Sequence, residues 1–531
     1  MASGINILLF FLWIFSAVAD YSDFCYVWQL KDYRLDRMRD FFSTEHGRNF
    51  WKKYILFWRS LIAIIIFLWP INSILTTKYF LIVLLGFEFI RNCYNLSKHR
   101  LIHPVFTKRA LLTIGLSICL EGFIFIMIKD WTLFLLFMIL RFFILSFISI
   151  SLILPNNLVK KYFIMKAAKK ISGQKKIIVI GVTGSYGKTS VKTFLSHILS
   201  KKFRVIKTPK NTNTEIGIAS FILKTDFSNV DIFVVEMGAY KIGEIKMICD
   251  MVKPSIGVLT AITYQHLSLF GDIAQTQKAK YELLRSLPPN GLAVVNIDNQ
   301  YCREFLPELK TNVATFGVDD QLSPTCLIKD VAASMDGVTC SGLIDNKIWN
   351  LTAPLVGAHN AINLAPCILI AHHLGMTDVE IMEQCKTLEL PDKTMKIYYY
   401  GKSTIIDDSY NANYHGFCAA LDALAAFSSK FKIVITNGIP ELGEKSFEIH
   451  EKIGEEIAYH SDILVVVNKD FYEPLCKGVG KKFNTKVYLI EEAAKLKKFI
   501  DEFKDKDAVI LIESRIPQSV YEKIIIRVPA Y

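Results

Sequence analysis

The chain has 531 residues, of which 52% are apolar, and its 62 Lys and Arg outnumber its 50 Asp and Glu. Residues 1–170 hold 21 Lys and Arg against 9 Asp and Glu, a surplus of 12 that accounts for the whole net charge of +12. The other 361 residues carry 41 of each sign, which argues against a nucleic-acid-binding globular domain, because such a domain needs its own basic surplus. The apolar content and the 11 scattered cysteines, none in a C-x-x-C pair, exclude disordered and disulfide-scaffold classes and indicate reduced thiols.

Five apolar stretches in the first 155 residues predict transmembrane helices, because a bilayer core about 30 Å thick needs roughly 20 mostly apolar residues per helix. They are residues 3–19, 54–74, 79–96, 110–128 and 131–154. The first stretch is short, and a cleaved signal peptide is the alternative interpretation of it. We expect it to be retained, because it lacks the basic segment with which such peptides begin.

Basic residues in the connecting loops orient these spans. Residues 20–53 hold seven Lys and Arg, residues 97–109 hold four and residues 160–176 hold seven, whereas residues 75–78 and 129–130 hold one each. The alternation predicts an outside N-terminus, five spans through a bacterial-type cytoplasmic membrane, and everything after residue 155 in the cytoplasm.

Four ionisable residues fall inside the predicted spans. We expect Arg59, near a cytoplasmic end, to extend its head group to the interface. Glu88, Glu121 and Arg141 lie near mid-span, where an unpaired charge is costly, so they are expected to face the bundle interior. Two interpretations stay open: a structural Glu–Arg pair between helices, and a polar groove for an amphiphilic ligand.

A glycine-rich segment follows the basic stretch. Residues 176–180 form a β-branched run typical of a buried strand, and apolar residues then repeat with helical spacing over 191–199. Glycines between a strand and a helix let backbone N–H groups surround a phosphate, while a lysine neutralises it and a Thr hydroxyl binds Mg²⁺. The loop residues assigned to nucleotide binding are Gly184, Ser185, Gly187, Lys188, Thr189 and Ser190.

The spacing G-x-T-G-x-x-G-K-T-S differs from the general phosphate-loop formula and resembles the Mur ligase family, which forms amide bonds with ATP in cell-wall precursor assembly. Further segments resemble the branch of that family that adds D-alanyl-D-alanine, and their order and separation match over about residues 175–460. They are TPKNTNTEIG (208–217), VVEMGA (234–239), HLSLFGDIAQTQKAKYE (266–282), GAHNAINLA (357–365), DDSYNAN (407–413) and ELGEKSFEIH (441–450).

The resemblance implies ATP and two Mg²⁺ ions. Thr189 and Glu236 match the ligands of the first ion, and His266 and Lys280 match the histidine and the carbamylated lysine of the second. A lysine ammonium cannot bind a cation, whereas CO₂ addition gives an anionic carbamate that can. Lys188, His266 and Lys280 are therefore the catalytic residues that the resemblance implies.

The nucleotide contacts implied by the resemblance lie farther along the chain. Asn363 matches the asparagine that meets adenine, and Asp408 matches the acid that contacts ribose and phosphate. Lys393 stands where most relatives carry an arginine, so it keeps the charge but lacks the planar fork. The implied reaction has two steps, an acyl phosphate made from ATP and its capture by an amine.

The sequence departs from the family pattern mainly where the substrate is expected to bind, and less in the nucleotide motifs. The membrane region stands in place of the usual N-terminal domain that binds uridine diphosphate. We therefore expect a peptide-bearing cell-wall precursor, soluble or lipid-linked, an amino acid or dipeptide as amine donor, membrane lipids as partners and no nucleic acid. Substitutions near the expected acyl substrate are Lys210, Thr214, Ala261, Ser268 and Asn437-Gly438-Ile439.

The predicted fold is an α-helical transmembrane bundle followed by α/β domains. The expected bounds are a membrane region over 1–155, a basic linker over 156–175, a central P-loop ATPase domain over 176–390 and a Rossmann-like C-terminal domain over 391–531. In the last domain a parallel sheet is expected, with buried strands at residues 405–409, 431–438, 462–468, 486–490 and 508–513. ATP is expected in the cleft between the last two domains. Three functions stay open: a membrane-anchored amide ligase, a ligase on the same framework that makes a polyglutamate-like polymer, and a non-catalytic ATP-binding membrane scaffold.

Overall fold

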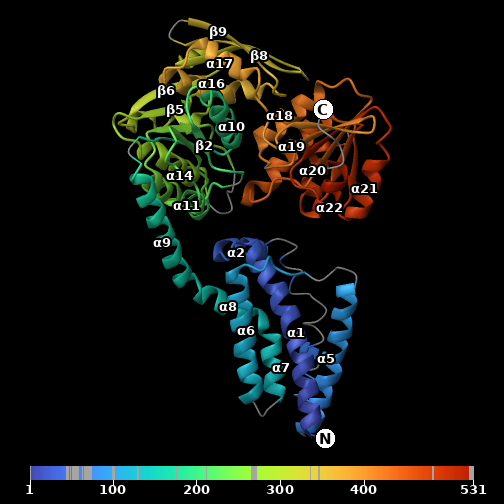
Figure 1. The fold of residues 1–531 in the computed structure, drawn as a ribbon. Coiled ribbons are helices and arrows are strands. Elements are labelled where there is room, and N and C mark those ends of the chain that lie inside the picture. Colours follow the sequence, from blue (N-terminus) through green and yellow to red (C-terminus); the bar gives the residue numbers. More distant parts are fainter. Residues whose placement is uncertain are drawn as a thin grey trace. The chain divides into compact units, whose positions relative to one another are not determined.

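The structure is a computed structural model of the chain (Figure 1). It describes residues 2–43, 47, 50, 59–61, 64, 74–97, 102–127, 131–174, 176–210, 212–264, 272–334, 336–344, 347–410, 412–480 and 484–525. The chain divides into two compact units, Met1–Lys160 and Lys161–Tyr531.

The described part of the N-terminal unit is helical. Its helices are α1 (Ala2–Leu30), α2 (Leu35–Ser43), α5 (Ile74–Ser97), α6 (Lys108–Met127), α7 (Trp131–Ile139), α8 (Arg141–Ser151) and the start of α9 (Ile153–Ser172). By length and composition, four stretches among the described residues could cross a membrane: Gly4–Leu30, Lys78–Ser97, Lys108–Met127 and Arg141–Ser172.

The helices differ from the predicted spans at three places. Helix α1 continues eleven residues beyond the predicted end at residue 19, because the following sequence keeps the helix free of Gly and Pro. The predicted span 131–154 is interrupted at Leu140 and Leu152, where one helix ends and the next begins. Helix α9 runs through most of the predicted linker 156–175, and the predicted span 54–74 lies almost wholly outside the described residues.

The second unit contains a nine-stranded sheet with the strand order β2-β3-β1-β4-β5-β6-β7-β8-β9. Its first seven members pair in parallel, and β8 and β9 add an antiparallel extension. The strands are β1 (Ile178–Thr183), β2 (Val205–Lys207), β3 (Ile232–Glu236), β4 (Ile256–Leu259), β5 (Leu292–Asn296), β6 (Asn312–Gly317), β7 (Cys326–Ser334), β8 (Gly337–Ile344) and β9 (Lys347–Ala353).

Helices cover both faces of this sheet, which explains why its parallel strands are apolar on both sides (Figure 1). One core joins the sheet to α10 (Lys188–Leu199), α16 (His359–His373) and α17 (Asp378–Cys385). The other joins it to α11 (Glu215–Lys224), α12 (Glu244–Val252), α14 (Ile273–Arg285) and the end of α9. The carboxyl ends of β1 and β3, neighbours in the sheet, are thereby held together at one edge.

A second sheet, of six strands, follows in the order β10-β11-β15-β12-β13-β14. The predicted parallel strands are confirmed as β11 (Ser403–Asp408), β12 (Phe431–Thr436), β13 (Ile463–Val466), β14 (Lys486–Leu489) and β15 (Ala508–Glu513). An antiparallel edge strand, β10 (Lys396–Tyr400), was not predicted. The helices of this domain are α18 (Tyr414–Ala425), α19 (Ser446–His460), α20 (Tyr472–Val479), α21 (Ala493–Asp501) and α22 (Gln518–Ile524).

Candidate active site

The phosphate-binding loop runs from the end of β1 to the start of α10, as the sequence predicts. Gly184 and Gly187 have φ angles of 149° and 76°, which side chains other than glycine rarely adopt. A Cβ atom at Gly187 would lie 2.7 Å from Oδ1 of Asn363, and one at Gly184 would collide with the Thr260 hydroxyl. The loop therefore needs glycine at both positions, and Asn363 lies directly beside it.

The remaining loop residues surround the helix N-terminus. Lys188 donates hydrogen bonds from Nζ to the carbonyl oxygens of Gly184 and Ser185, at 2.8 and 3.0 Å. The Ser185 hydroxyl accepts from the Thr263 backbone N–H at 3.1 Å. Burial lowers the pKa of Lys188, although the Glu236 carboxylate opposes that shift. Ser190 lies half-buried in the first turn of α10.

The predicted pair Thr189 and Glu236 is brought together. Glu236 ends β3, and its Oε2 accepts a hydrogen bond from the Thr189 hydroxyl at 3.0 Å, while its Oε1 accepts from Asn213 at 3.1 Å. Burial raises the pKa of Glu236, but Lys192 and Lys188 outweigh burial and hold the pKa below its usual value. An ionised carboxylate thus stands beside a hydroxyl at the N-terminus of α10.

Lys192 is a site residue that the sequence reasoning missed. Its Nζ lies 2.8 Å from Glu236 Oε2, and both side chains are almost completely buried. The signal was available, because Lys192 lies one helical turn after Lys188 and so shares its face of α10.

Lys280 belongs to the same electrostatic group. It lies on α14 with an exposed fraction of 4%. Burial and the positive charge of Lys188 lower its pKa to about 7, against the smaller opposing effects of Glu244, Glu236 and Glu282. Of the predicted residues Lys188, Glu236, His266 and Lys280, three therefore act on one another: Lys188, Glu236 and Lys280. His266, the fourth, lies outside the described residues, and among the described ones no group of three or more His, Cys, Asp or Glu could hold a metal ion.

Asn363, the residue assigned to adenine, lies near the N-terminus of α16. Nδ2 of Asn363 donates to Oδ1 of Asn360 at 3.2 Å, and Asn360 in turn donates to the Val356 carbonyl at 2.7 Å. This chain of bonds fixes the Asn363 amide next to Gly187. His359 is buried, which lowers its pKa to about 4, so it is neutral at pH 7.

The C-terminal domain contributes the loop after β11. Oδ1 of Asp408 accepts from the Met395 N–H at 3.2 Å, and burial raises the pKa of Asp408 to about 7. Tyr410, two residues after Asp408, interacts with the Thr189 hydroxyl, and the charge of Glu236 acts on it. The loop after β11 therefore reaches the phosphate-binding loop of the central domain, as a two-domain cleft requires.

The Lys393 side chain lies over the ring of Tyr521 on α22. Its Nζ lies 4.1 Å from the centroid of the Tyr521 ring, and its charge acts on Asp407. The Tyr521 hydroxyl donates to Asp407 at 2.7 Å. A nucleotide contact of Lys393 stays a prediction.

Glu513 is a second residue that the sequence reasoning missed. It ends β15 and lies opposite Asp408 in the parallel register of β11 and β15. Its side chain is fully buried, and among the described residues no N–H or O–H group donates to either carboxylate oxygen. No sequence motif indicated Glu513, because this acid ends an otherwise apolar strand.

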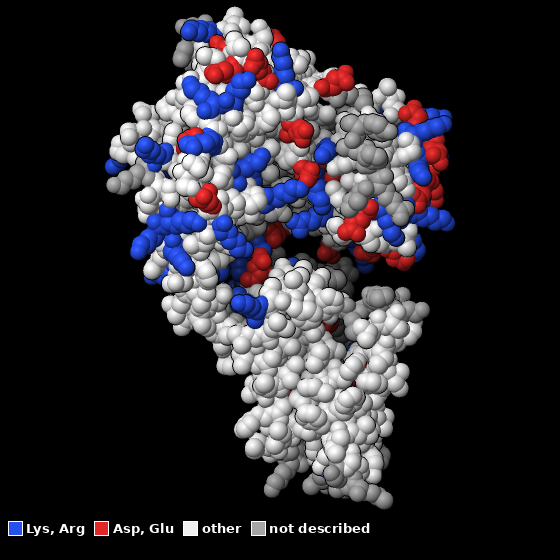
Figure 2. Space-filling view, viewed as in Figure 1, with Lys and Arg blue, Asp and Glu red and all other residues white. Residues whose placement is uncertain are grey.

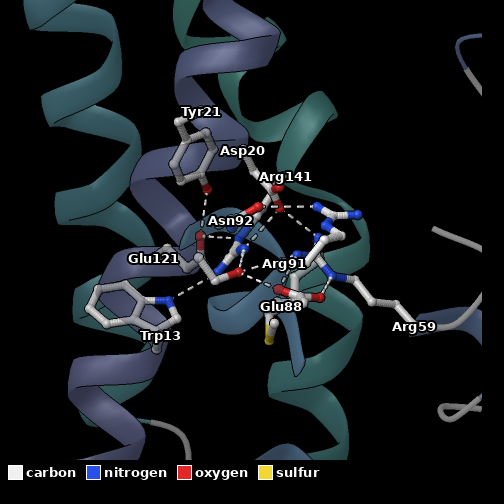
Figure 3. Close-up of polar contacts among 11 residues, drawn as sticks. Trp13, Asp20, Tyr21, Arg59, Glu88, Arg91, Asn92, Glu121 and Arg141 are labelled. Carbon is white, nitrogen blue, oxygen red and sulfur yellow. Dashed lines mark hydrogen bonds and ion pairs between the residues drawn. The ribbon is translucent and has the colours of Figure 1, made fainter. Parts of the chain in front are cut away.

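A separate group of charged side chains lies inside the N-terminal unit (Figure 3). Arg59 Nε lies 2.8 Å from Glu88 Oε1, and Arg141 Nη2 lies 2.8 Å from Glu121 Oε1. Asp20 Oδ2 bridges the two guanidinium groups at 2.7 and 2.9 Å. The predicted Glu–Arg pair is thus confirmed for Glu121 and Arg141. The prediction that Arg59 reaches the interface is wrong, because its side chain is fully buried and pairs with Glu88.

Neutral residues complete this charged group. The Ser16 hydroxyl donates to Glu88 at 2.6 Å, and Trp13 and Tyr21 donate to Glu121 at 2.8 and 2.7 Å. Every nitrogen of both guanidinium groups has an oxygen partner. This saturation favours the structural interpretation over a groove that offers free donors to a ligand. Asp20 was missed because the predicted first span ended one residue earlier.

Comparisons with known proteins agree with this geometry. Residues 182–371 match the Mur ligase middle domain, and residues 395–515 match the Mur ligase, glutamate ligase domain. A UDP-N-acetylmuramoyl-tripeptide–D-alanyl-D-alanine ligase of Synechocystis sp. is 32% identical over 283 residues, which cover 53% of this chain and 59% of that protein. The enzyme of the same name from Escherichia coli is 29% identical over 320 residues, covering 59% of this chain and 69% of the relative.

Solved structures show the same fold. The structure of MurF ligase from Thermotoga maritima in complex with ADP has a TM-score of 0.59 and 26% identity, and covers 69% of this chain and 82% of that one. MurF from Acinetobacter baumannii has a TM-score of 0.62 at 23% identity, covering 68% and 79%. The chain spans little more than half of the length of its Synechocystis relative.

Proposed function

Since residues 182–371 and 395–515 are Mur ligase domains, the chain belongs to the Mur ligase family, and we propose that it is an ATP-dependent ligase that forms an amide bond in peptidoglycan precursor synthesis. The observation that carries the proposal is the phosphate-binding loop with Thr189 3.0 Å from Glu236. The names of the relatives support a substrate that bears a peptide carboxyl group, and D-alanyl-D-alanine or a similar amine donor.

In this reaction the protein mainly positions the reactants and neutralises their charge. The substrate carboxylate attacks the γ-phosphorus of ATP, the bond to ADP breaks, and an acyl phosphate forms. The amine nitrogen then attacks the acyl carbon, loses a proton, and inorganic phosphate leaves. Lys188, half-buried at the helix N-terminus, would leave the loop carbonyls and neutralise the phosphates.

The residues fit a magnesium ion. Mg²⁺ prefers oxygen ligands, and the Thr189 hydroxyl and the ionised Glu236 carboxylate supply two at one point of the loop. The ion, when bound, neutralises charge on the phosphates. Lys192 and Asn213 hold the Glu236 carboxylate in place. The second ion rests on the sequence assignment of His266 and Lys280.

Carbamylation of Lys280 is part of the proposal. A lysine with a pKa of about 7 is substantially unprotonated at neutral pH, and the free amine is the form that adds CO₂. Carbon-13 bicarbonate should therefore give a carbamate NMR signal in the wild type. The control variant Lys278→Met, which removes an exposed lysine of the same helix, should give the same signal. The signal should vanish in Lys280→Met, and its absence from the wild type would reject the carbamate.

Membrane anchoring of the ligase is also proposed. Four described stretches are long and apolar enough to cross a membrane. On the face shown in Figure 2 the N-terminal helices carry almost no charged side chains. Large apolar side chains of these helices, such as Val83, Ile126 and Phe147, are more than two-thirds exposed. Soluble proteins rarely expose so much contiguous apolar surface. The catalytic domains would then lie on the cytoplasmic side, as the basic loops predict.

The anchor suggests where the acyl substrate is found. We expect a lipid-linked peptide precursor at the inner membrane face, because the matched ligase domains begin only at residue 182, after the apolar helices. The purified chain, given ATP and D-alanyl-D-alanine, should extend a lipid-linked peptide. Extension of a UDP-linked peptide alone would reject the membrane-presented substrate but keep the ligase.

The ligase function itself is tested by phosphate release. Lys188→Ala should abolish ATP-dependent phosphate release in the presence of substrates, because it removes the cation of the loop. Lys246→Ala, which changes an exposed lysine paired with Asp250, should release phosphate at the wild-type rate. Unchanged release by Lys188→Ala would remove the ligase assignment.

A further inference from the structure

Two acids, one half-buried and one fully buried, lie side by side at the carboxyl edge of the C-terminal sheet. Asp408 ends β11, Glu513 ends β15, and the two are register partners in neighbouring parallel strands. Glu513 has no exposed surface, and among the described residues its oxygens receive no hydrogen bond from an N–H or O–H group. Ligands of α/β proteins bind at this edge of the sheet.

Among the residues that the structure describes, those named as acting on Asp408 and Glu513 include no cation. Asp407 on β11 adds another carboxyl, and Cys418 faces Glu513 from α18. The charge of Lys393 acts on Asp407, and Tyr521 on α22 donates to Asp407 as well. Two adjacent carboxyl groups in an apolar setting cannot both be ionised without a cation, so the pair must hold a proton.

We propose, building on the ligase function above, that Glu513 stays protonated and donates a hydrogen bond to the Asp408 carboxylate, and that this bond positions Asp408 for the nucleotide ribose. Glu513 is thus a positioning residue that acts through Asp408. The Met395 N–H, 3.2 Å from Asp408 Oδ1, is the second donor to the same carboxylate.

Backbone geometry around the pair is consistent with a constrained site. Met395 and Ser514 have φ angles of 55° and 70°, in the left-handed region that residues other than glycine rarely occupy. Ser514 directly follows Glu513, and its hydroxyl accepts a hydrogen bond from the Asn437 N–H at 2.9 Å. The backbone thereby fixes both ends of the proposed hydrogen bond.

Protonation equilibria agree with this arrangement. Burial, together with Asp408, raises the pKa of Glu513 well above its usual value. Burial also raises the pKa of Asp408 to about 7, and the hydrogen bond from Glu513 limits that rise. Above pH 7 the pair is therefore an Asp408 carboxylate that accepts from a neutral Glu513, and the carboxylate has a lone pair left for a ribose hydroxyl.

The proposal is tested by the pH dependence of ADP binding to the full chain with Mg²⁺. Wild-type affinity should rise as the pH increases through about 7, because Asp408 becomes an acceptor. Glu513→Gln keeps a donor and should keep the wild-type midpoint. Glu513→Leu removes the donor, so the midpoint should move to higher pH and affinity at pH 7.5 should fall about tenfold.

The control variant is Glu502→Gln, which changes an exposed acid of the same domain. ADP itself titrates equally in this variant and in the wild type, so their curves of ADP affinity against pH should coincide. If Glu513→Gln moved the midpoint to lower pH, Glu513 would be an ionised neighbour and the proposal would be wrong. ADP binding that is equal in all variants would reject it and leave the ligase standing, whereas no ADP binding at any pH would reject both.

Discussion

At the scale of single residues, the central domain is organised around one carboxylate. Glu236 is held by Lys192, Thr189 and Asn213, and it acts on Lys188 and Lys280 from the end of β3. Sequence motifs located four of these residues, since each belongs to a recognisable segment. Lys192 and Glu513 escaped because their roles depend on which strand end or helix face the fold brings next to them.

The buried pair of Lys192 and Glu236 gives a stability prediction. Lys192→Met leaves a buried carboxylate with fewer partners and should lower the free energy of unfolding by about 3 kcal/mol. Mg²⁺ with ADP should restore part of this loss, because it supplies another positive charge. Thermal unfolding with and without Mg²⁺·ADP measures both effects.

Lys246→Met serves as the control for that prediction. Its ion pair with Asp250 is exposed on α12, so its removal should cost less than about 1 kcal/mol. Equal effects of the two variants would show that the buried pair does not stabilise the site.

At the scale of elements, the hydrophobic periodicity and the lengths of apolar runs predicted the parallel strands of the C-terminal domain. The five parallel strands of the C-terminal sheet were predicted because each is a short apolar run flanked by polar residues. β10 was missed, since Lys396–Tyr400 carries three tyrosines and alternates poorly. Helix breaks at Leu140 and Leu152 were missed because apolar sequence continues without Gly or Pro through both.

The charged group of the N-terminal helices gives a second prediction. Arg141→Met leaves Glu121 and Asp20 without one of their cations inside an apolar bundle, and should destabilise the unit by about 3–5 kcal/mol. The double variant Arg141→Met/Glu121→Gln removes both charges of one pair and should recover much of that loss. Thermal unfolding of the detergent-solubilised chain provides the comparison, and a double variant no better than Arg141→Met would contradict the pairing.

At the scale of the whole molecule, the chain joins apolar helices to two Mur ligase domains, and a buried histidine in each makes the stability of the fold sensitive to acid. Burial lowers the pKa of both His359 and His450 to about 4, from 6.5. Between these values the unfolded chain binds protons that the folded chain does not, so stability falls as the pH drops from about 7 to 4. Each histidine accounts for about 3 kcal/mol of that loss.

His450→Gln should therefore reduce the acid-induced fall in the thermal midpoint between pH 7 and pH 4.5. Gln keeps an acceptor for the Ile439 N–H, which now donates to His450 Nε2 at 2.9 Å. His373→Gln, at an exposed position, should leave the fall unchanged. An identical pH profile of His450→Gln and the wild type would contradict the assignment.

Amide formation by the two α/β domains is the central claim, and the mass of the product tests it most directly. Purified chain, cell-envelope extract, ATP and an amine donor should yield a peptide precursor heavier by the donor minus one water, with one ADP and one phosphate formed per product. Lys188→Ala should yield none. Phosphate formed without an amide product, or an equal product yield from Lys188→Ala, would contradict the account.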